Sequence, residues 1–350
     1  MKILQNMCKN VFEYRRKALS FHPIVSSTKR YYCSRWDNTK LRVLFFGTDN
    51  FSLPSLRVLN ESLKSGGTVS SLEVVTSFKA KKNPLKQYAQ NENLALHSWP
   101  IQRTSIKGTF DLGVVVSFGH LIPEELIAGF RLGMLNVHAS LLPKLRGAAP
   151  IVHAIKNGDS ETGVTIMRIK PNHFDVGEIL TQRRVPIGTD TLMPELHTKL
   201  AEIGASALLS CIENIDHYLE NLIAQHDCDA TYAPKVTPHF SNIRWHGQSA
   251  KEVYDLYRSL VSYKPLTTHL DGKLVKMFKV SYDPQQQCDV NAKAGRIEYC
   301  RKRKRLRVSG SDGKFVEIDH LSIGGKRIMS AQEFNNGYLS KTNSENRFFE

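Results

Sequence analysis

The sequence predicts an α/β fold: a doubly wound, Rossmann-like domain with a parallel sheet, followed by a smaller, OB-like β-barrel domain. In the first two thirds of the chain, short apolar, β-favouring segments alternate with helical patterns, which is typical of a sheet covered by helices. After about residue 241 the pattern changes to short strands separated by turn residues, as in a small barrel. A length of 350 residues also suits two domains, each with its own core.

Five strands are expected in the first domain, each a run of apolar or β-branched residues: 41–46, 72–76, 112–116, 134–138 and 163–169. The first of them is apolar except at Arg42, which indicates a buried strand of a parallel sheet. Helical apolar spacing is found over 51–63 and 192–223. The first strand ends at Gly47-Thr48-Asp49, which is not the Gly-x-Gly-x-x-Gly motif of dinucleotide sites. This weakens a dinucleotide or nucleoside-triphosphate assignment.

The second domain is expected to be rich in β-structure. A helix is predicted over 252–260, and Ser330 with Glu333 has the capping-box spacing that begins another. Strands are predicted over 273–280, 304–308 and 314–320. We therefore expect the chain to consist of four segments: a targeting peptide (1–40), a catalytic domain (41–222), a linker (223–240) and the barrel domain (241–350).

The first forty residues are basic and lack a long apolar run. They hold nine Lys and Arg against two acidic residues, a composition typical of a mitochondrial targeting peptide. The alternative is a basic arm that touches nucleic acid directly. We therefore expect a mitochondrial matrix protein. The chain contains no apolar run of about 20 residues, so no membrane span is expected.

The six cysteines are scattered, without C-x-x-C spacing or clustering with histidines. They predict neither a disulfide framework nor a metal site.

The strand predicted over 134–138 ends in Asn136-Val137-His138. Strand side chains alternate between faces, so Asn136 and His138 point to one face. In α/β sheets, ligands bind at the carboxyl ends of the strands. Asp175 lies in a polar turn between two apolar strands, and it returns to the same sheet edge if those strands neighbour this one. The alternative is that Asn136 and His138 only satisfy backbone groups at a strand end.

Together these three side chains suit acyl transfer to an amine. The amide of Asn136 can donate to a developing oxyanion, an interaction worth about 3 kcal/mol in comparable sites. His138 can share that role when protonated or remove a proton from the amine, and Asp175 can orient its ring. No Ser or Cys nucleophile accompanies the pair. Direct transfer is therefore expected.

The segments around these residues resemble the folate-dependent formyltransferases. The matching motifs, in order, are Leu44–Thr48, Val115–Pro123, Asn136–His138, Ser140–Pro143, Arg146–Ile151, Gly163–Met167 and Phe174–Glu178. The resemblance implies that Asn136, His138 and Asp175 are catalytic. It also implies that 10-formyltetrahydrofolate is the formyl donor, without a metal. The folate contacts it implies are Phe118, Gly119, Leu121, Ser140, Leu141, Leu142 and Pro143.

The second half is similar to the methionyl-tRNA formyltransferase branch of this family. Thr231–Lys235, followed by Ile243–Trp245, resembles the linker of those enzymes and the entry to their barrel. This implies initiator methionyl-tRNA as the formyl acceptor. The chain departs from the family at Phe174, where an aliphatic residue is common. It also departs at 77–86, which is shorter than the basic loop of the bacterial members.

Arg301–Arg307 places six cations in seven positions. Such a cluster repels itself unless an anion lies opposite, and the phosphate backbone of tRNA is the expected partner. The alternative is a solvated loop or a nuclear localisation signal. The predicted tRNA contacts are Lys79, Lys81, Lys82, Arg146, Arg301, Lys302, Arg303, Lys304 and Arg305.

Two other functions remain open at this point. A formyltransferase with the same Asn, His and Asp could act on a sugar nucleotide or on glycinamide ribonucleotide, although neither acceptor requires a basic barrel. A non-catalytic tRNA-binding relative would have no need of all three residues. We expect a monomer.

Overall fold

The computed structural model describes residues 40–78, 83–101, 106, 108–343 and 346–350. The targeting peptide predicted over 1–40 lies outside these ranges, apart from Lys40. Within the described ranges, none of the helices has the length and apolarity needed to cross a membrane.

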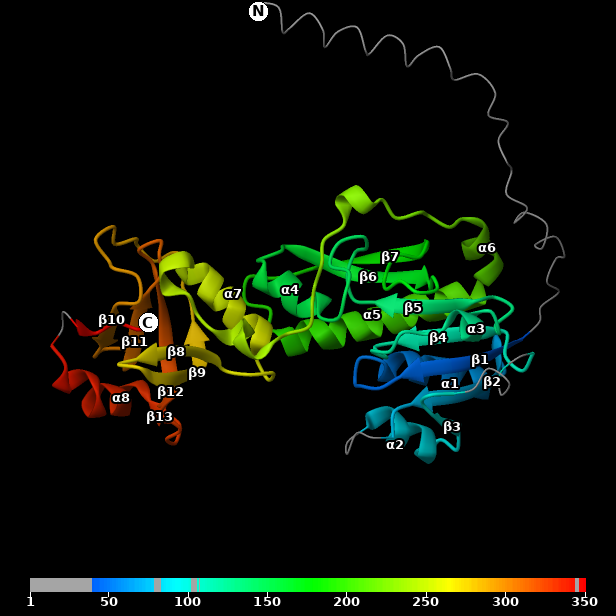
Figure 1. Cartoon of the computed structure of the whole chain (residues 1–350), viewed down its shortest axis with the longest axis horizontal. Helices are drawn as coiled ribbons and strands as arrows, with labels where there is room; N and C mark the ends of the chain where they lie inside the picture. Colours follow the sequence, from blue (N-terminus) through cyan, green and yellow to red (C-terminus); the bar gives the residue numbers. More distant parts are fainter. Residues whose placement is uncertain (1–39, 79–82, 102–105, 107, 344–345) are drawn as a thin grey trace, which may run out of the picture. The chain divides into compact units, whose positions relative to one another are not determined.

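The first domain is built on a seven-stranded sheet with the order β3-β2-β1-β4-β5-β6-β7 (Figure 1). The strands are β1 (Leu41–Gly47), β2 (Val69–Thr76), β3 (Ala95–Ser98), β4 (Leu112–Val116), β5 (Met134–His138), β6 (Glu161–Arg168) and β7 (Ile179–Pro186). The doubly wound fold is confirmed. The five predicted strands are present, whereas β3 and β7 were not predicted as separate ranges. The first five strands in this order are parallel, but β5 and β6 pair antiparallel, as do β6 and β7. The sheet is therefore parallel from β3 to β5, as expected, with two antiparallel pairings added at its β6 and β7 side. The short connection from β6 to β7 holds no helix, and such a connection joins only antiparallel strands.

Among the described residues, six helices accompany this sheet. They are α1 (Leu53–Lys64), α2 (Pro84–Asn91), α3 (Glu124–Ile127), α4 (Pro150–Lys156), α5 (Met193–Glu213) and α6 (Ile215–Glu220). The long helix expected over 192–223 is divided between α5 and α6 at Asn214. The backbone of Asn214 leaves the helical region (φ −125°, ψ 37°), and its side-chain amide donates to the Ser210 carbonyl 3.1 Å away.

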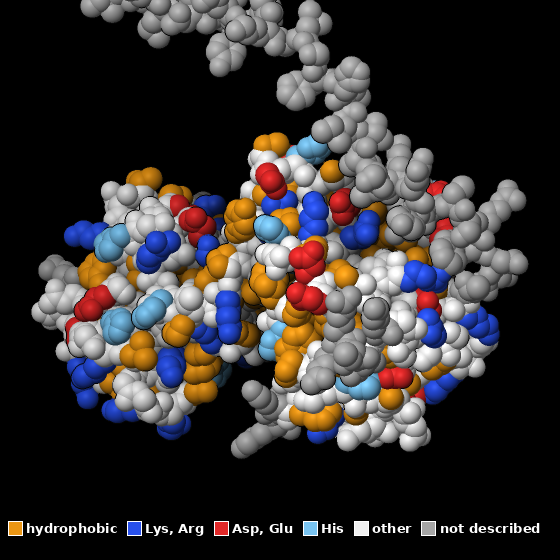
Figure 2. All heavy atoms as spheres, turned by 45° about the vertical axis from the view of Figure 1, so that its right-hand side comes forward, with side chains coloured by type: hydrophobic (Ala, Val, Ile, Leu, Met, Phe, Trp, Pro, Cys, Tyr) orange, Lys and Arg blue, Asp and Glu red, His pale blue; other side chains and the backbone are white. Residues whose placement is uncertain are grey.

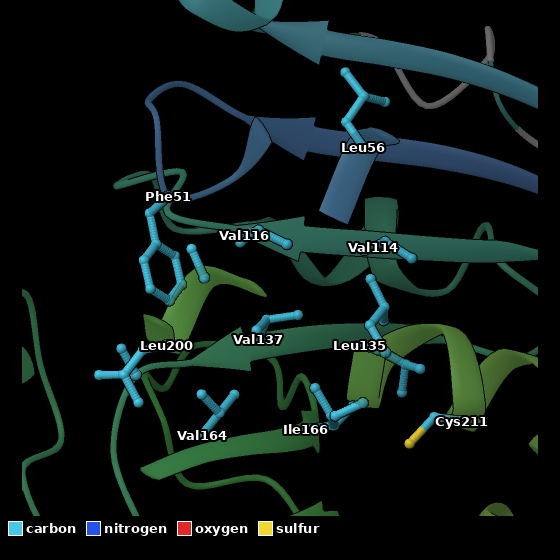
Figure 3. Close-up of a cluster of buried hydrophobic side chains, with 14 of the residues drawn as sticks. Phe51, Leu56, Val114, Val116, Leu135, Val137, Val164, Ile166, Leu200 and Cys211 are labelled. Carbon is cyan, nitrogen blue, oxygen red and sulfur yellow. The ribbon is translucent and has the colours of Figure 1, made fainter. Parts of the chain in front are cut away.

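The strands bury both faces, and alternation along β5 decides where its polar residues lie. Leu135 and Val137 point into a core closed by α1 and α5, as Figure 3 shows for side chains of β4, β5, β6 and α5. Met134 points to the opposite face, where a second core contains Phe118 and the α3 residues Leu126 and Ile127. Asn136 and His138 share the face of Met134 because they follow it at even spacing.

The second domain has six antiparallel strands and two helices (Figure 1). Its elements are α7 (Ala250–Leu260), β8 (Leu266–Leu270), β9 (Lys273–Ser281), β10 (Ile297–Cys300), β11 (Arg305–Ser309), β12 (Phe315–Ile323), β13 (Met329–Ser330) and α8 (Ala331–Gly337). Short 3₁₀ turns lie at η3 (Asp227–Asp229), η4 (Pro238–Ser241), η5 (Trp245–Gly247) and η6 (Leu339–Lys341). The capping box at Ser330 is confirmed, since Ser330 and Glu333 bond reciprocally at the start of α8.

The C-terminal residues join the two edges of this sheet, which gives it the barrel character that the sequence predicted. On the β10 side, the Phe349 amide donates to Gly295 O (2.9 Å). On the β8 side, the Glu350 amide donates to His269 O (3.0 Å). The Phe349 ring is 1% exposed and stacks on Trp245 in the core.

Helix α7 of the second domain is bonded to the loop that leads into α5. Arg258 is 2% exposed and its Nε donates to the buried carboxylate of Asp255 (2.8 Å). Its Nη1 donates to the carbonyl oxygens of Gly188 (3.3 Å) and Thr191 (3.1 Å). Helices α4 and α7 also pack together, and Val152 of α4 belongs to the core of the second domain. The start of α5 is therefore held by residues of both domains.

Candidate active site

The structure brings Asn136, His138 and Asp175 together. The Asn136 amide Nδ2 lies 3.4 Å from Asp175 Oδ1, and His138 Nδ1 lies 3.5 Å from the same oxygen. His138 is 6% exposed and Asn136 is half-buried. An amide donor, an imidazole and a carboxylate thus share one partly enclosed position on the sheet face.

Asp175 reaches this position by a route that the sequence did not predict. In the antiparallel register Leu135 lies opposite Arg168 and His138 opposite Thr165. Strand β6 therefore ends beside the amino end of β5, and the loop to β7 has to turn back toward His138. The sequence analysis made the return of Asp175 depend on a neighbouring strand, and β6 does neighbour β5. Because β6 runs antiparallel, Asp175 reaches His138 through the loop after the strand.

The backbone around Asp175 fixes its carboxylate. Asp175 has φ +55°, a conformation that is strained for a residue with a side chain and persists only where its surroundings hold it. The Gly147 amide donates to Asp175 Oδ2 at 2.9 Å. Gly177 lies so close to β6 that a Cβ there would be 1.7 Å from Arg168 O, so this turn requires glycine. The carboxylate is therefore oriented before any substrate binds.

The second nitrogen of the His138 ring is also fixed. His138 Nε2 lies 3.0 Å from the carbonyl oxygen of Leu145, which can only accept, so Nε2 carries a proton. In the neutral ring, Nδ1 is then the free base on the side of Asn136 and Asp175. In the charged ring, the Nδ1 proton points at Asp175. The ring can thus take up a proton without turning.

The loop Ser140–Pro143 supports this geometry and does not line the cavity described below. Ser140 is fully buried and its hydroxyl donates to Lys144 O (2.7 Å). The Thr165 hydroxyl donates to Ser140 O (2.7 Å) and accepts from the Leu142 amide (3.1 Å). These bonds place the loop behind the His138–Leu145 contact. The structure thus gives this loop a supporting role, and the predicted folate contacts of Ser140, Leu141, Leu142 and Pro143 stay predictions.

A cavity of about 940 Å³ opens beside the three residues, and Asn136, His138 and Asp175 all line it. One wall is largely apolar and comes from the segment after β4, namely Phe118, Gly119, His120, Leu121 and Ile122. The predicted contacts Phe118, Gly119 and Leu121 are therefore in place to meet a ligand. Phe174, where the chain departs from the family pattern, is 60% exposed and also lines the cavity.

Two cavity residues of α5 were missed by the sequence analysis. Met193 and His197 lie one turn apart and line the cavity. The His197 ring packs edge-on against Phe51, with centroids 5.4 Å apart. Burial lowers the pKa of His197 from its ordinary value, an effect that the nearby Asp49 opposes. The i, i+4 spacing of the two residues is the signal that could have placed them on one helix face.

The matching family models and the most similar relatives indicate the same protein family. The formyl transferase model matches residues 41–212, and the model of the formyl transferase C-terminal domain matches 235–339. A mitochondrial methionyl-tRNA formyltransferase of Homo sapiens is 39% identical over 85% of this chain and 78% of its own length. A methionyl-tRNA formyltransferase of Chlorobium luteolum is 33% identical over 85% of this chain and 97% of its own. The chain belongs to the methionyl-tRNA formyltransferase family.

Solved structures of the wider family share the fold. The crystal structure of WlaRD, a sugar 3N-formyl transferase in the presence of dTDP and 5-N-formyl-THF, has a TM-score of 0.61 and 19% identity. The match covers 82% of this chain and 99% of the WlaRD chain. The family models begin and end close to the predicted domain limits of 41–222 and 241–350, which stay predictions.

Arg146, within the family motif Arg146–Ile151, lies in a different environment from the one predicted. Its side chain is 6% exposed. The guanidinium donates to Gln225 Oε1 and, through Nη1, to Asp227 Oδ1 (2.9 Å). In this structure the guanidinium is buried and occupied by two protein partners, and its predicted contact with tRNA stays a prediction.

The basic cluster has an internal anion. Glu317 on β12 has a side chain only 7% exposed and lies within ion-pair distance of Arg303 (3.2 Å), Arg305 (3.5 Å) and Arg307 (3.2 Å). Asp319 is a second carboxylate at the cluster, 2.9 Å from Arg305. Its arginines therefore have anionic partners within the domain, and their contact with tRNA stays a prediction.

Of the remaining predicted cations, some are exposed and others lie outside the described residues. Arg301, Lys302 and Lys304 are exposed in the turn between β10 and β11. Figure 2 shows that Lys and Arg side chains are spread over the visible face of the second domain, on the left of the view. The predicted contacts Lys79, Lys81 and Lys82 lie outside the described residues. Across the described ranges, no group of three or more His, Cys, Asp or Glu side chains could hold a metal ion.

Proposed function

We propose that this protein transfers the formyl group of 10-formyltetrahydrofolate to the free amino group of initiator methionyl-tRNA, as a monomer in the mitochondrial matrix. The observation that carries the proposal is the meeting of Asn136, His138 and Asp175 at the base of one cavity. The names of the relatives support methionyl-tRNA as the acceptor, and the name of the human relative supports the mitochondrion as the organelle. The basic composition of residues 1–40 agrees with import.

The cavity has the size and chemistry that two substrates of this kind need. Its volume of about 940 Å³ lies at the upper end of small-molecule sites. The wall from Phe118 to Ile122 offers aromatic and aliphatic surface for the flat folate ring, with Leu121 45% exposed. Asn136, His138 and Asp175 meet at one place in this lining, where the reacting carbon would lie.

Each polar side chain has a distinct part in the transfer. His138, through Nδ1, removes a proton from the amine as its nitrogen attacks the formyl carbon. The Asn136 amide donates to the oxygen that becomes negative when the carbonyl bond opens. Asp175 stabilises the charged His138 ring. When the bond from the formyl carbon to folate N10 breaks, the proton held by His138 is available to N10. The products are formyl-methionyl-tRNA and tetrahydrofolate.

The direct test uses purified protein without residues 1–40. We expect it to formylate methionyl-tRNA when 10-formyltetrahydrofolate is supplied, measured as acid-stable formyl-methionyl ester. An amino-sugar nucleotide and glycinamide ribonucleotide serve as alternative acceptors. Transfer to either of these, with none to methionyl-tRNA, would contradict the proposal.

A second prediction concerns the exposed turn. Replacing Arg301, Lys302 and Lys304 by glutamate is expected to weaken tRNA binding and to lower the slope of log affinity against log salt by about one per lost phosphate contact. Filter binding between low and physiological salt measures this slope. Lys341→Glu, an exposed charge change in the same domain, is the control and should leave the slope nearly unchanged. An unaltered slope in the triple variant would exclude the turn as a tRNA contact.

A further inference from the structure

Two polar side chains connect the linker to the loop that carries Asp175. Arg146 follows the Ser140–Pro143 loop, and its side chain is 6% exposed. Its Nε and Nη2 atoms both donate to Gln225 Oε1, at 3.1 and 2.8 Å. Gln225 lies within the segment predicted as the linker, 79 positions further along the chain. When two N–H groups of a guanidinium donate to the same amide oxygen, they fix the orientation of the whole amide group.

The other end of the Gln225 amide holds the backbone around Asp175. Gln225 Nε2 donates to the carbonyl oxygen of Asp175 (3.0 Å) and to that of Gly177 (2.8 Å). Both protons of the amide are thereby used, and they hold the chain on either side of Val176. This is the segment in which Asp175 has φ +55°. A strained conformation of this kind persists only where neighbouring groups fix it.

The backbone of the linker and of the catalytic loop complete the unit. The Arg146 amide donates to Thr231 O (2.8 Å), and the Ala233 amide donates to Arg146 O (2.7 Å). Gly147 has φ +124°, and a Cβ on it would lie 2.7 Å from Ala233 O, so the close approach of the linker requires glycine. Through its own amide, Gly147 also donates to the Asp175 carboxylate. The linker therefore contacts the Asp175 backbone through Gln225 and sets the position of the Gly147 donor.

We propose that Arg146 and Gln225 are positioning residues for Asp175, and that the linker is a structural part of the catalytic centre. Arg146 orients the Gln225 amide, and that amide holds Asp175 at the distance from Asn136 and His138 that the reaction needs. Neither residue touches the reacting atoms. The expected loss of kcat rests on the proposed function. The expected loosening of the backbone around Asp175 does not, because it can be measured without substrate.

The sharpest variant is Gln225→Glu. It keeps the length of the side chain and an oxygen acceptor for Arg146, but it replaces the two N–H donors with oxygen. We expect kcat to fall roughly 100-fold, as when a catalytic group is displaced by about 1 Å, while KM for both substrates changes little. Hydrogen exchange at the amides of residues 174–178 should become faster in the free protein. Gln225→Met, of similar length and without charge, should show the same changes if the glutamate variant folds poorly.

A matched control separates positioning from loss of stability. Gln286 in the second domain also donates through its amide to two backbone carbonyls, those of Asp283 and Phe315. Gln286→Glu should therefore lower Tm to a similar extent and leave kcat and exchange over 174–178 unchanged. Arg146→Lys, which removes the forked donor, should repeat the Gln225 pattern.

Distinct results would overturn the two proposals. Unchanged exchange over 174–178 in both Gln225 variants, or a fall in Tm with normal kcat, would reject the positioning role. Inactive wild-type protein, with exchange over 174–178 still faster in the variants, would reject the proposed function alone.

Discussion

Replacing His138 with alanine is expected to lower kcat for formyl transfer by about 10²- to 10⁴-fold, the usual contribution of a positioned acid–base group. The variant loses the imidazole whose Nδ1 lies 3.5 Å from Asp175 Oδ1, beside Asn136. It also leaves the acceptor amine without a proton acceptor. Affinity for tRNA should be almost unchanged, because His138 is 6% exposed at the base of the cavity. Single-turnover kinetics and filter binding at one salt concentration measure the two quantities.

The control for this prediction is His217→Ala. His217 is exposed on α6 and does not line the cavity, so its loss should leave kcat near the wild-type value. Asn136→Ala provides a graded comparison, with an expected loss of about 10²- to 10³-fold for one oxyanion donor. A His138→Ala protein with wild-type turnover would show that the amine loses its proton elsewhere.

The largest expected effect on stability is that of Arg258→Ala. Breaking a buried ion pair by removing one partner costs about 3–5 kcal/mol, because the other charge stays buried without compensation. Here the remaining carboxylate is that of Asp255, whose side chain is 4% exposed. It keeps the half-exposed Lys251 ammonium as a partner, so the expected loss lies at the lower end of this range. The carbonyl oxygens of Gly188 and Thr191 lose a donor as well. Urea unfolding, followed by the fluorescence of Trp245 in the second domain, measures the change in unfolding free energy.

Lys251→Ala is the matched control for Arg258→Ala. Lys251 pairs with the same carboxylate, but its side chain is 48% exposed. Exposed pairs contribute about 0–1 kcal/mol, so this change should be small. Equal losses in the two variants would show that burial does not decide the strength of these contacts.

The fold could be predicted where the sequence pattern reports burial. Strands β1, β4 and β5 are apolar over most of their length and were found within a residue of their true limits. Strand β3 was missed because Ala95–Ser98 is short and half-exposed at the sheet edge, so it has no apolar run. The antiparallel direction of β6 could not be predicted, because hydrophobic periodicity is the same in either direction.

The candidate site, too, could be predicted only in part. Asn136, His138 and Asp175 could be proposed because side chains with useful chemistry stand in ordered motifs. The supports of the site are the Leu145 carbonyl, the Gly147 amide and the Gln225 side chain, and two of these are backbone groups common to every residue. The position of Glu317 beneath the basic cluster depends on the pairing of Arg307 with Glu317 across β11 and β12. Only the register of the sheet supplies that information.

The closure of the barrel by its last residues has a consequence for folding kinetics. Thr268 and Glu350 are bonded across 82 positions of sequence, and Phe349 packs on Trp245 at a greater separation. Contacts between distant residues incur the loop-closure entropy before they contribute any stability, which slows folding. The edges of β8 and β10 therefore stay open until the final segment docks. During that interval they are the part of the second domain most exposed to pairing with another chain.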